Sequence, residues 1–355
     1  MTDKLKIAMV GCGAVTEHRH IPSFNKIKNK VAVKAACDRN IELAKKVAGK
    51  YGISGVYASQ TEMLKNEKID IVDVCTPPQI HAPVAIEALE HGCHVLMEKP
   101  MALTVNDCDK MIDAAKSNNR KLCVVHNVLF HPPLIKAKKL FKEGAIGDFR
   151  GMRILLSDPK DEMIMRSDYW IHKLPGGVIG ETGPHPVYIS LAFLDKINNL
   201  EIFTKNYLEH PWARFDEFRF ELEANNGISS VAVSYSGERY AAEVEILGSR
   251  GALYVDLQSM LCLKYGPKTS LGFNKLISNS LSTVTQILGG IMCNGLKVIT
   301  GRFKVGHDTV VELFIDSIIN NTEPPVTGED GREVIRVMEI LVSKLNDKYG
   351  QPAGN

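Results

Sequence analysis

Two glycines follow directly after a short apolar run near the start of the chain, and this arrangement constrains the fold more than any other stretch. The run from Lys4 to Val10 has the length of a strand. Its apolar residues are nearly continuous, as in a parallel strand that is buried on both faces. Gly11 and Gly13 come next and precede a stretch that can start a helix. This order predicts a phosphate-binding turn at a helix N-terminus.

A second β-rich run, Val31 to Cys37, ends on Asp38. A carboxylate there can accept hydrogen bonds from both ribose hydroxyls, and it repels a 2′-phosphate, which favours NAD. Arg39 can pair with that phosphate, so NADP stays open as the alternative. Thr16 stands where a third glycine or alanine would ease packing. We therefore predict a dinucleotide site formed by Gly11, Gly13, Ala14, Val15, Asp38 and Arg39. The alternative is an ordinary turn without a ligand.

Length and composition set the broad class of the protein. A chain of 355 residues predicts two domains. The net charge of +2 gives no electrostatic case for a nucleic-acid partner. The chain enters its first strand at once, which leaves no room for a signal peptide. Its eight cysteines show no CxxC pair or zinc-ligand spacing. We therefore expect a reduced, cytoplasmic protein without a metal site.

Strands and helices alternate up to Asn127, which predicts a doubly wound parallel sheet in a first domain, residues 1–127. The predicted strands cover residues 4–10, 31–37, 69–75, 94–97 and 121–125, and the predicted helices 41–48, 61–66, 83–90 and 105–117. Ligands bind at the carboxyl ends of such strands. Those ends are Gly11–Gly13, Asp38, Thr76–Pro78, Glu98–Pro100 and His126–Asn127.

Lys99 is the most informative residue at these strand ends. A lysine beside a dinucleotide can lower the pKa of a substrate hydroxyl or take part in a proton relay. A structural ion pair with Glu98 is the alternative. Pro100 indicates a loop held in one shape, with either peptide isomer open.

The pattern changes after Asn127, which predicts a second domain over residues 128–355. We expect a helix that follows His131-Pro132-Pro133 and closes at Gly144, a strand at 149–157, a long polar loop at 158–174 and an apolar helix at 187–194. Four further strands are predicted at 215–224, 228–235, 241–247 and 252–257. This pattern predicts an α+β domain with an open, mostly antiparallel sheet. We expect the sheet to form a homo-oligomer, either a dimer or a tetramer.

Glu181 and His185 lie four residues apart and would share one face of a helical turn. A histidine can take the proton from an alcohol while hydride leaves to nicotinamide. The carboxylate would orient that histidine or contact a sugar hydroxyl. The alternative is a histidine satisfied locally at a helix start.

The stretch from Tyr265 to His307 is longer and more apolar than a simple connection. Its apolar residues fall at helical spacing, and polar residues and glycines interrupt it, which argues against a membrane span. A packed or oligomer-interface helix is the favoured interpretation, and membrane contact is not expected. The alternative is a membrane-surface helix or a lid over a phosphorylated or lipid-linked substrate. The basic residues that would suit it are Lys297, Arg302 and Lys304.

Five motifs in fixed order resemble the glucose–fructose oxidoreductase / inositol dehydrogenase / MocA (Gfo/Idh/MocA) family of NAD(P)-dependent oxidoreductases. The motifs are Gly11-Cys12-Gly13, Asp38, Thr76-Pro77-Pro78 with His81, Glu98-Lys99-Pro100, and the stretch Gly176–His185. The resemblance covers nearly the whole chain and includes Pro324 to Gly328. It implies an N-terminal Rossmann domain and a C-terminal α+β domain with an open sheet.

The resemblance also implies an enzyme that oxidises or reduces a secondary alcohol of a sugar, cyclitol or nucleotide sugar. Lys99 and His185 are then catalytic, with Glu181 where many members carry Asp. The further cofactor contacts are Thr76, Pro77, Pro78, His81, Glu98, Lys99 and Asn127. The predicted substrate site consists of Lys99, Asn127, Tyr169, Trp170, Glu181 and His185. A non-catalytic NAD-binding regulator, or reductive cleavage of a tetrapyrrole-like compound, is the alternative.

Overall fold

The computed structural model describes residues 4–159, 162–267 and 273–351, and the chain divides into two compact units. Unit 1 comprises Met1–Asn127 and Gly306–Arg336, and unit 2 comprises Val128–Val305 and Val337–Asn355. The sequence places one boundary after Asn127, as the structure does. It assigns residues 306–336 to the second domain, whereas the structure groups them with the first.

Polar contacts explain why the segment after residue 305 belongs to unit 1. Helix α11 (Gly306–Ile319) packs against α1 (Ile21–Lys26). Ser23 Oγ donates a hydrogen bond to Asp308 Oδ1 over 2.8 Å, and Lys26 Nζ lies 2.6 Å from Asp308 Oδ2. These residues are more than 280 positions apart along the chain, so no local sequence pattern reports their contact.

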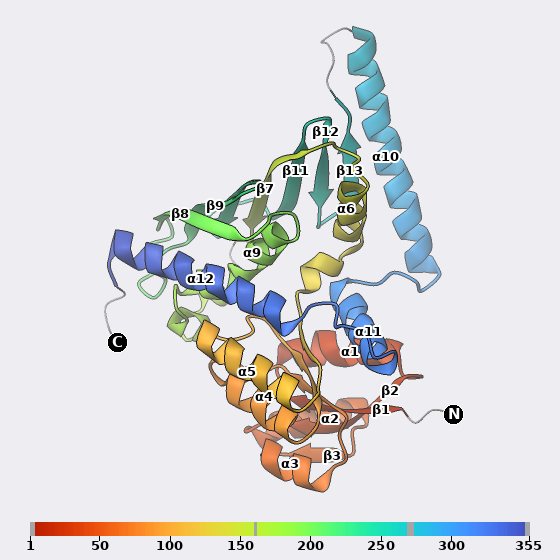
Figure 1. Ribbon diagram of the computed structural model, residues 1–355, viewed down its shortest axis with the longest axis vertical. Helices are drawn as coiled ribbons and strands as arrows, with labels where there is room; N and C mark the ends of the chain where they lie inside the picture. Colours follow the sequence, from red (N-terminus) through yellow and green to blue (C-terminus); the bar gives the residue numbers. More distant parts are fainter. Residues whose placement is uncertain (1–3, 160–161, 268–272, 352–355) are drawn as a thin grey trace. The chain divides into compact units, whose positions relative to one another are not determined.

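Unit 1 is built on a six-stranded sheet with the order β3-β2-β1-β4-β5-β6, and all its strand pairs are parallel (Figure 1). The strand order reverses between β1 and β4, so the sheet is doubly wound, as predicted. The short β3 was not predicted. The strands are β1 (Leu5–Val10), β2 (Val31–Cys37), β3 (Gly55–Tyr57), β4 (Ile71–Val74), β5 (His94–Met97) and β6 (Leu122–Val124).

The helices of unit 1 begin where the sequence supplies caps. Asn40, Ser59 and Thr104 each accept a hydrogen bond from a backbone N–H in the first turn of the helix that follows, as N-cap residues do. Besides α1 and α11, the helices are α2 (Ile41–Tyr51), α3 (Gln60–Asn66), α4 (His81–Glu90) and α5 (Val105–Ser117). Helix α12 (Gly328–Tyr349) begins in unit 1 and ends in unit 2.

Unit 2 contains a seven-stranded sheet with the order β13-β12-β11-β7-β10-β9-β8. The β10–β7 pair is parallel and the other pairs are antiparallel, so the sheet is mostly antiparallel, as predicted. The edge strands β8 and β13 were not predicted. The strands are β7 (Phe149–Ser157), β8 (Ile197–Lys205), β9 (Glu217–Ala224), β10 (Gly227–Ser234), β11 (Ala241–Gly248), β12 (Gly251–Asp256) and β13 (Leu261–Tyr265).

The burial pattern of β9 shows that one face of this sheet is covered. Phe218, Phe220 and Leu222 are buried, while Arg219 and Glu221 between them are exposed. The helices of unit 2 are α6 (Pro132–Lys142), α7 (Glu162–Met165), α8 (Val178–Thr182), α9 (Pro184–Leu191) and α10 (Phe273–Ile299).

Two local predictions in unit 2 need correction. The polar stretch at 158–174 is not all loop, because it contains α7 and a 3₁₀ turn at Trp170–Lys173. The helix expected at 187–194 begins at Pro184, since proline is well suited to the first turn of a helix.

Candidate functional site

The glycine turn after β1 has the conformation that the sequence predicts. Gly11 has a φ of +92°, and a Cβ there would lie 2.5 Å from the Cys75 carbonyl oxygen. Only glycine fits such a position. No atom lies within 4 Å of where a Cβ on Gly13 would be, so the turn is open on that side. A helix starts at Ala14, and its first N–H groups have no partners within the helix. The turn therefore suits a phosphate at a helix N-terminus.

Thr16, which stands where a third glycine or alanine would be expected, makes a structural hydrogen bond. Its Oγ1 donates a 2.6 Å hydrogen bond to the Gly11 carbonyl oxygen, and its side chain is fully buried. The residue begins a π-helical turn, Thr16–His20, which continues into α1. Thr16 thus ties the glycine turn to the helix by a hydrogen bond.

Asp38 lies at the carboxyl end of β2, beside the glycine turn. Its Oδ2 accepts a 2.9 Å hydrogen bond from the Cys12 N–H, and its Oδ1 accepts one of 2.8 Å from the Asn40 N–H. A carboxylate offers about four acceptor sites, so two backbone bonds leave room for ribose hydroxyls. The neighbouring Arg39 is exposed. Asp38 therefore fixes the turn and keeps the acceptors that NAD recognition needs.

His81 lies in the predicted cofactor motif, but its geometry is that of a brace. Its ring nitrogens lie 2.9 Å from the Pro100 carbonyl oxygen and 2.7 Å from that of Thr76. Burial lowers the pKa of His81, and the side chain has no exposed surface for a cofactor to touch. His81 instead joins the loops after β4 and β5, where Pro77 is exposed, Pro78 is buried and the Lys99–Pro100 bond is cis.

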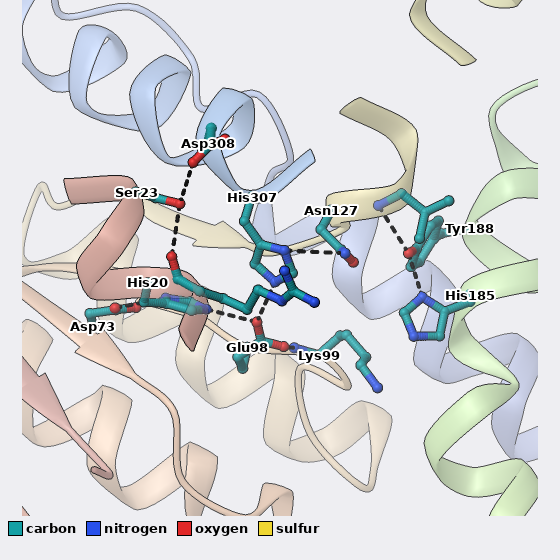
Figure 2. A network of polar contacts seen from close by, with 12 residues as sticks. His20, Ser23, Asp73, Glu98, Lys99, Asn127, His185, Tyr188, His307 and Asp308 are labelled. Carbon is teal, nitrogen blue, oxygen red and sulfur yellow. Dashed lines mark hydrogen bonds and ion pairs between the residues drawn. The ribbon is translucent and has the colours of Figure 1, made fainter. Parts of the chain in front are cut away.

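His20 lies between two carboxylates at the strand ends of unit 1 (Figure 2). Its Nδ1 is 2.8 Å from Asp73 Oδ2, and its Nε2 is 2.8 Å from Glu98 Oε1. His20 and Asp73 have no exposed surface, and Glu98 is 8% exposed. A neutral imidazole can donate only one hydrogen bond. Because both ring nitrogens face carboxylate oxygens, the geometry is that of an imidazolium bridging Asp73 and Glu98.

The pKa shifts of His20 and Glu98 agree with this protonation state, whereas burial outweighs the charge of His20 and raises the pKa of Asp73. Burial alone would lower the pKa of His20, but the charge of Asp73 outweighs it and holds the pKa well above the ordinary value. Burial alone would raise the pKa of Glu98, but hydrogen bonds from His20 and His307 hold that pKa well below its ordinary value. The side-chain atoms of His20, Glu98 and His307 that could ligate a metal ion lie within 4.8 Å of one another. The hydrogen bonds among these three residues explain this spacing.

The network reaches two predicted site residues, Lys99 and Asn127. Glu98 Oε2 accepts a 3.0 Å hydrogen bond from the Lys99 backbone N–H, and the Lys99 side chain extends away from the network (Figure 2). His307 Nε2 lies 3.5 Å from Glu98 Oε1, and Asn127 Nδ2 lies 3.4 Å from His307 Nδ1. The buried Glu98 carboxylate thus holds the backbone from which the Lys99 side chain starts.

In unit 2, α8 holds Glu181 and α9 holds His185, with Gly183 between the helices. His185 Nδ1 lies 2.5 Å from the Tyr188 hydroxyl, and the two rings meet edge to face (Figure 2). Tyr188 is 2% exposed, and its hydroxyl accepts a 3.4 Å hydrogen bond from the Val128 N–H. Tyr188 therefore fixes the orientation of the His185 ring.

Tyr169 and Trp170, the predicted substrate residues of unit 2, are neighbours with stacked rings. Their ring centres are 6.1 Å apart, and the Arg166 guanidinium carbon lies 5.3 Å from the centre of the Tyr169 ring. Both rings are half-buried, as is Glu181 in α8. Partly exposed aromatic rings are typical of surfaces that contact sugar rings by their faces.

A groove of about 580 Å³ lies elsewhere in unit 1, at the amino ends of β5 and β6. Its lining includes Arg120 and Lys121, whose side chains donate hydrogen bonds to the carbonyl oxygens of Gly92 and Thr322. Ligands of doubly wound sheets bind at the opposite, carboxyl ends of the strands. We therefore place the candidate site at the glycine turn and not in this groove.

Four residues of these contacts were not predicted from the sequence, namely His20, Asp73 and His307 in unit 1 and Tyr188 in unit 2. Asp73 has a signal, because it is the one carboxylate within the apolar run at 71–75. Such a residue in a buried strand needs a partner. Tyr188 lies three positions after His185, a spacing at which helical side chains meet. His20 and His307 have no such signal, because their partners are distant in the sequence.

Comparison with known proteins supports both units. The model of an oxidoreductase family with an NAD-binding Rossmann fold, GFO_IDH_MocA, matches residues 5–126, and the model of the GFO/IDH/MocA C-terminal domain matches residues 134–254. Oxidoreductase P35 of Formosa agariphila is 24% identical over 259 residues, which span 71% of this chain and 79% of that protein. A dTDP-3,4-didehydro-2,6-dideoxy-alpha-D-glucose 3-reductase of Streptomyces violaceoruber is 27% identical over 71% of this chain and 72% of its own length.

Among solved structures, the WlbA dehydrogenase from Bordetella pertussis, in complex with NADH and UDP-GlcNAcA, has the same fold. It superposes with a TM-score of 0.80 over 99% of both chains, at 19% sequence identity. The family models, the parallel sheet and the glycine turn agree with one another. The chain belongs to the Gfo/Idh/MocA family and is an NAD-binding oxidoreductase.

Proposed function

We propose that the protein transfers hydride between nicotinamide and a secondary alcohol or ketone of a sugar, cyclitol or nucleotide sugar. The contact between the buried Glu98 carboxylate and the Lys99 backbone carries this proposal. It holds a lysine at a strand end of the sheet whose glycine turn suits a dinucleotide. Two relatives add support, because one is named as a reductase of a dTDP-linked sugar and the other was solved with NADH and UDP-GlcNAcA.

The turn and its neighbours would hold the cofactor. The helix after Gly13 offers N–H groups to the pyrophosphate, and Asp38 offers acceptors to the ribose. We assign cofactor contacts also to Ala14, Val15 and the exposed Pro77. Bound NAD supplies the hydride acceptor or, when reduced, the hydride donor. Asp38 favours NAD over NADP by repelling a 2′-phosphate.

Lys99 and His185 have separate roles in this proposal. The Lys99 ammonium polarises the substrate oxygen and stabilises negative charge on it. His185 takes the hydroxyl proton during oxidation and returns it during reduction. Tyr188 keeps the imidazole in one orientation, and Glu181 orients the histidine or a sugar hydroxyl. Tyr169, Trp170 and Asn127 contact the substrate.

The predicted homo-oligomer stays a proposal. The exposed side chains of β9, including Arg219, Glu221 and Glu223, give the outer face of the sheet mixed charge. A second copy would supply matching charges only in a limited set of orientations. Light scattering would give the number of chains in the assembly.

The test is the absorbance of reduced nicotinamide while NAD is offered with a panel of sugars, inositols and nucleotide sugars. We expect turnover with at least one nucleotide sugar or sugar. His185→Ala should lower kcat by about 10²- to 10⁴-fold, since that is the usual contribution of a general acid–base group. His172→Ala, at another histidine of unit 2, is the control. Silence across the panel with intact NAD binding would favour the non-catalytic regulator.

A further inference from the structure

Helix α10 turns two of its amide side chains, Gln286 and Asn294, toward the protein, while most of its large aliphatic side chains are exposed. It lies along β13, an edge strand of the unit 2 sheet (Figure 1). Gln286 Oε1 accepts a 2.8 Å hydrogen bond from the Lys264 N–H, and Gln286 Nε2 donates one of 3.0 Å to the Lys264 carbonyl oxygen. Asn294 Nδ2 donates a 3.0 Å hydrogen bond to the Met260 carbonyl oxygen. The Gln286 amide thus satisfies backbone groups of the edge strand that otherwise face solvent, and the Asn294 amide satisfies a carbonyl of the turn just before that strand.

The opposite side of α10 is apolar and open. Its large aliphatic side chains recur every three or four residues, so they form one continuous stripe along the helix. The six central ones are between 44% and 74% exposed, namely Ile277, Leu281, Val284, Leu288, Ile291 and Met292. Leu296 and Ile299 extend the stripe to the end of the helix. A contiguous exposed apolar surface of this kind marks an interaction site.

The charge around α10 identifies the occupant. Residues 257–307 contain six lysines and arginines and no aspartate or glutamate. Lys297 lies in the last turn of α10, and Arg302 and Lys304 come after the helix ends at Ile299. A stripe of aliphatic side chains joined to basic residues matches the surface of a bilayer that carries anionic lipids.

A second copy of α10 fits this charge pattern less well. Paired helices are stabilised when acidic and basic residues flank the apolar seam. Two copies of this segment would bring together only basic groups, which repel each other. An anionic lipid surface provides the missing negative charge and accepts the apolar stripe at the same time.

The helix would lie on the membrane and not across it. At about 1.5 Å per residue, its 27 residues span about 40 Å. Among the residues that the structure describes, no helix combines the length and apolarity that a bilayer span requires. Gln286 is bonded to β13 and Asn294 to Met260 in the turn before it, so one side of the helix stays on the protein. We propose that α10 docks unit 2 on the surface of anionic membranes.

Vesicle flotation tests this proposal with the full chain. We expect the protein to float with vesicles that contain phosphatidylglycerol and to stay at the bottom with vesicles of phosphatidylcholine alone. The double variant Leu281→Asn with Leu288→Asn should no longer float. The matched control, Ile135→Asn with Ile319→Asn, removes two aliphatic side chains of similar exposure from α6 and α11 and should float as the unaltered protein does.

Charge neutralisation separates the electrostatic from the apolar part. The triple variant Lys297→Gln, Arg302→Gln, Lys304→Gln should partition on the order of 100-fold more weakly, since each basic residue adds about one factor of five. Equal flotation with both kinds of vesicle would overturn the role of anionic lipid. Flotation with neither kind would overturn the proposal.

The second-copy alternative has its own result. If Leu281→Asn with Leu288→Asn converts an oligomer to smaller species while the unaltered protein never floats, α10 is an interface between chains. Unchanged fluorescence of the two tryptophans, which both lie in unit 2, shows that unit 2 is folded in each variant. Because these readouts do not use turnover, the proposal stands or falls apart from the proposed function.

Discussion

The strand ends of unit 1 bury charge, whereas helix α10 of unit 2 exposes hydrocarbon. Both reverse the usual arrangement, in which charged groups face water and aliphatic groups face the core. At the strand ends the chain supplies the opposite charge itself, because His20 lies between Asp73 and Glu98. Along α10, Gln286 and Asn294 bond to β13 and the turn before it, and among the described residues the aliphatic stripe is exposed. The comparison shows that buried charge indicates an internal network and exposed hydrocarbon an external partner.

The largest expected effect is the removal of the central cation of the network. His20→Leu leaves two buried carboxylates without their partner and should lower the free energy of unfolding by about 3–5 kcal/mol. Both tryptophans lie in unit 2, so their fluorescence does not report directly on the unfolding of unit 1, where His20 lies. The change is therefore measured by urea unfolding followed by circular dichroism. His18→Leu, in the same π-helical turn but exposed, should change it by less than about 0.5 kcal/mol. Equal values for the two variants would contradict the network.

The pH dependence of stability comes next. The pKa of His20 is raised above its ordinary value of 6.5, so its stabilisation is complete below that pH and is lost as pH rises through the raised pKa. The free energy of unfolding should fall above pH 6.5 by up to about 1.4 kcal/mol per pH unit. Asp73→Asn removes the main charge that raises this pKa and should flatten the fall. Parallel curves for the two proteins would refute the assignment.

The pKa of Glu98 acts in the opposite direction at low pH. It is held below its ordinary value of 4.5, so its stabilisation is present above that pH and is lost as pH falls through the lowered pKa. The network therefore contributes most to the free energy of unfolding between pH 4.5 and pH 6.5, the ordinary pKa values of Glu98 and His20.

The smallest effects are expected along α10. Gln286→Leu removes two hydrogen bonds to Lys264 and should cost about 1–2 kcal/mol in the unfolding of unit 2, followed by tryptophan fluorescence. Leu281→Asn lies on the open stripe and should change that free energy by less than about 0.5 kcal/mol. A larger loss with Leu281→Asn than with Gln286→Leu would mean that the apolar stripe is packed and the comparison is wrong.

The sequence predicts those parts of the fold that depend on local pattern. Continuous apolar runs such as 69–75 predict the parallel strands, and the glycine turn with Asp38 predicts the dinucleotide site. Strand β8 was missed although Leu200 and Ile202 alternate with polar residues, because asparagines at its start favour a loop. Strand β13 was missed because it runs into the apolar segment that forms α10.

The network could not be predicted, because its members meet only through the fold. His20 and Glu98 are 78 positions apart, and His307 reaches them only because residues 306–336 belong to unit 1. The helical spacing of 281–299 is readable in the sequence, and α10 confirms it. Which side of that helix faces the protein is set by the contacts of Gln286 with Lys264 and of Asn294 with Met260, which no local sequence pattern reports.

We propose that catalysis depends on Lys99, the lysine that follows Glu98 of the buried network. The most direct measurement compares turnover and NADH affinity in the unaltered protein, in Lys99→Met and in the exposed-lysine control Lys45→Met. We expect Lys99→Met to lower kcat by at least about 10²-fold, while the Kd for NADH stays within a few-fold of that of the unaltered protein. Unchanged turnover in Lys99→Met, measured on any substrate that the unaltered protein accepts, would contradict it.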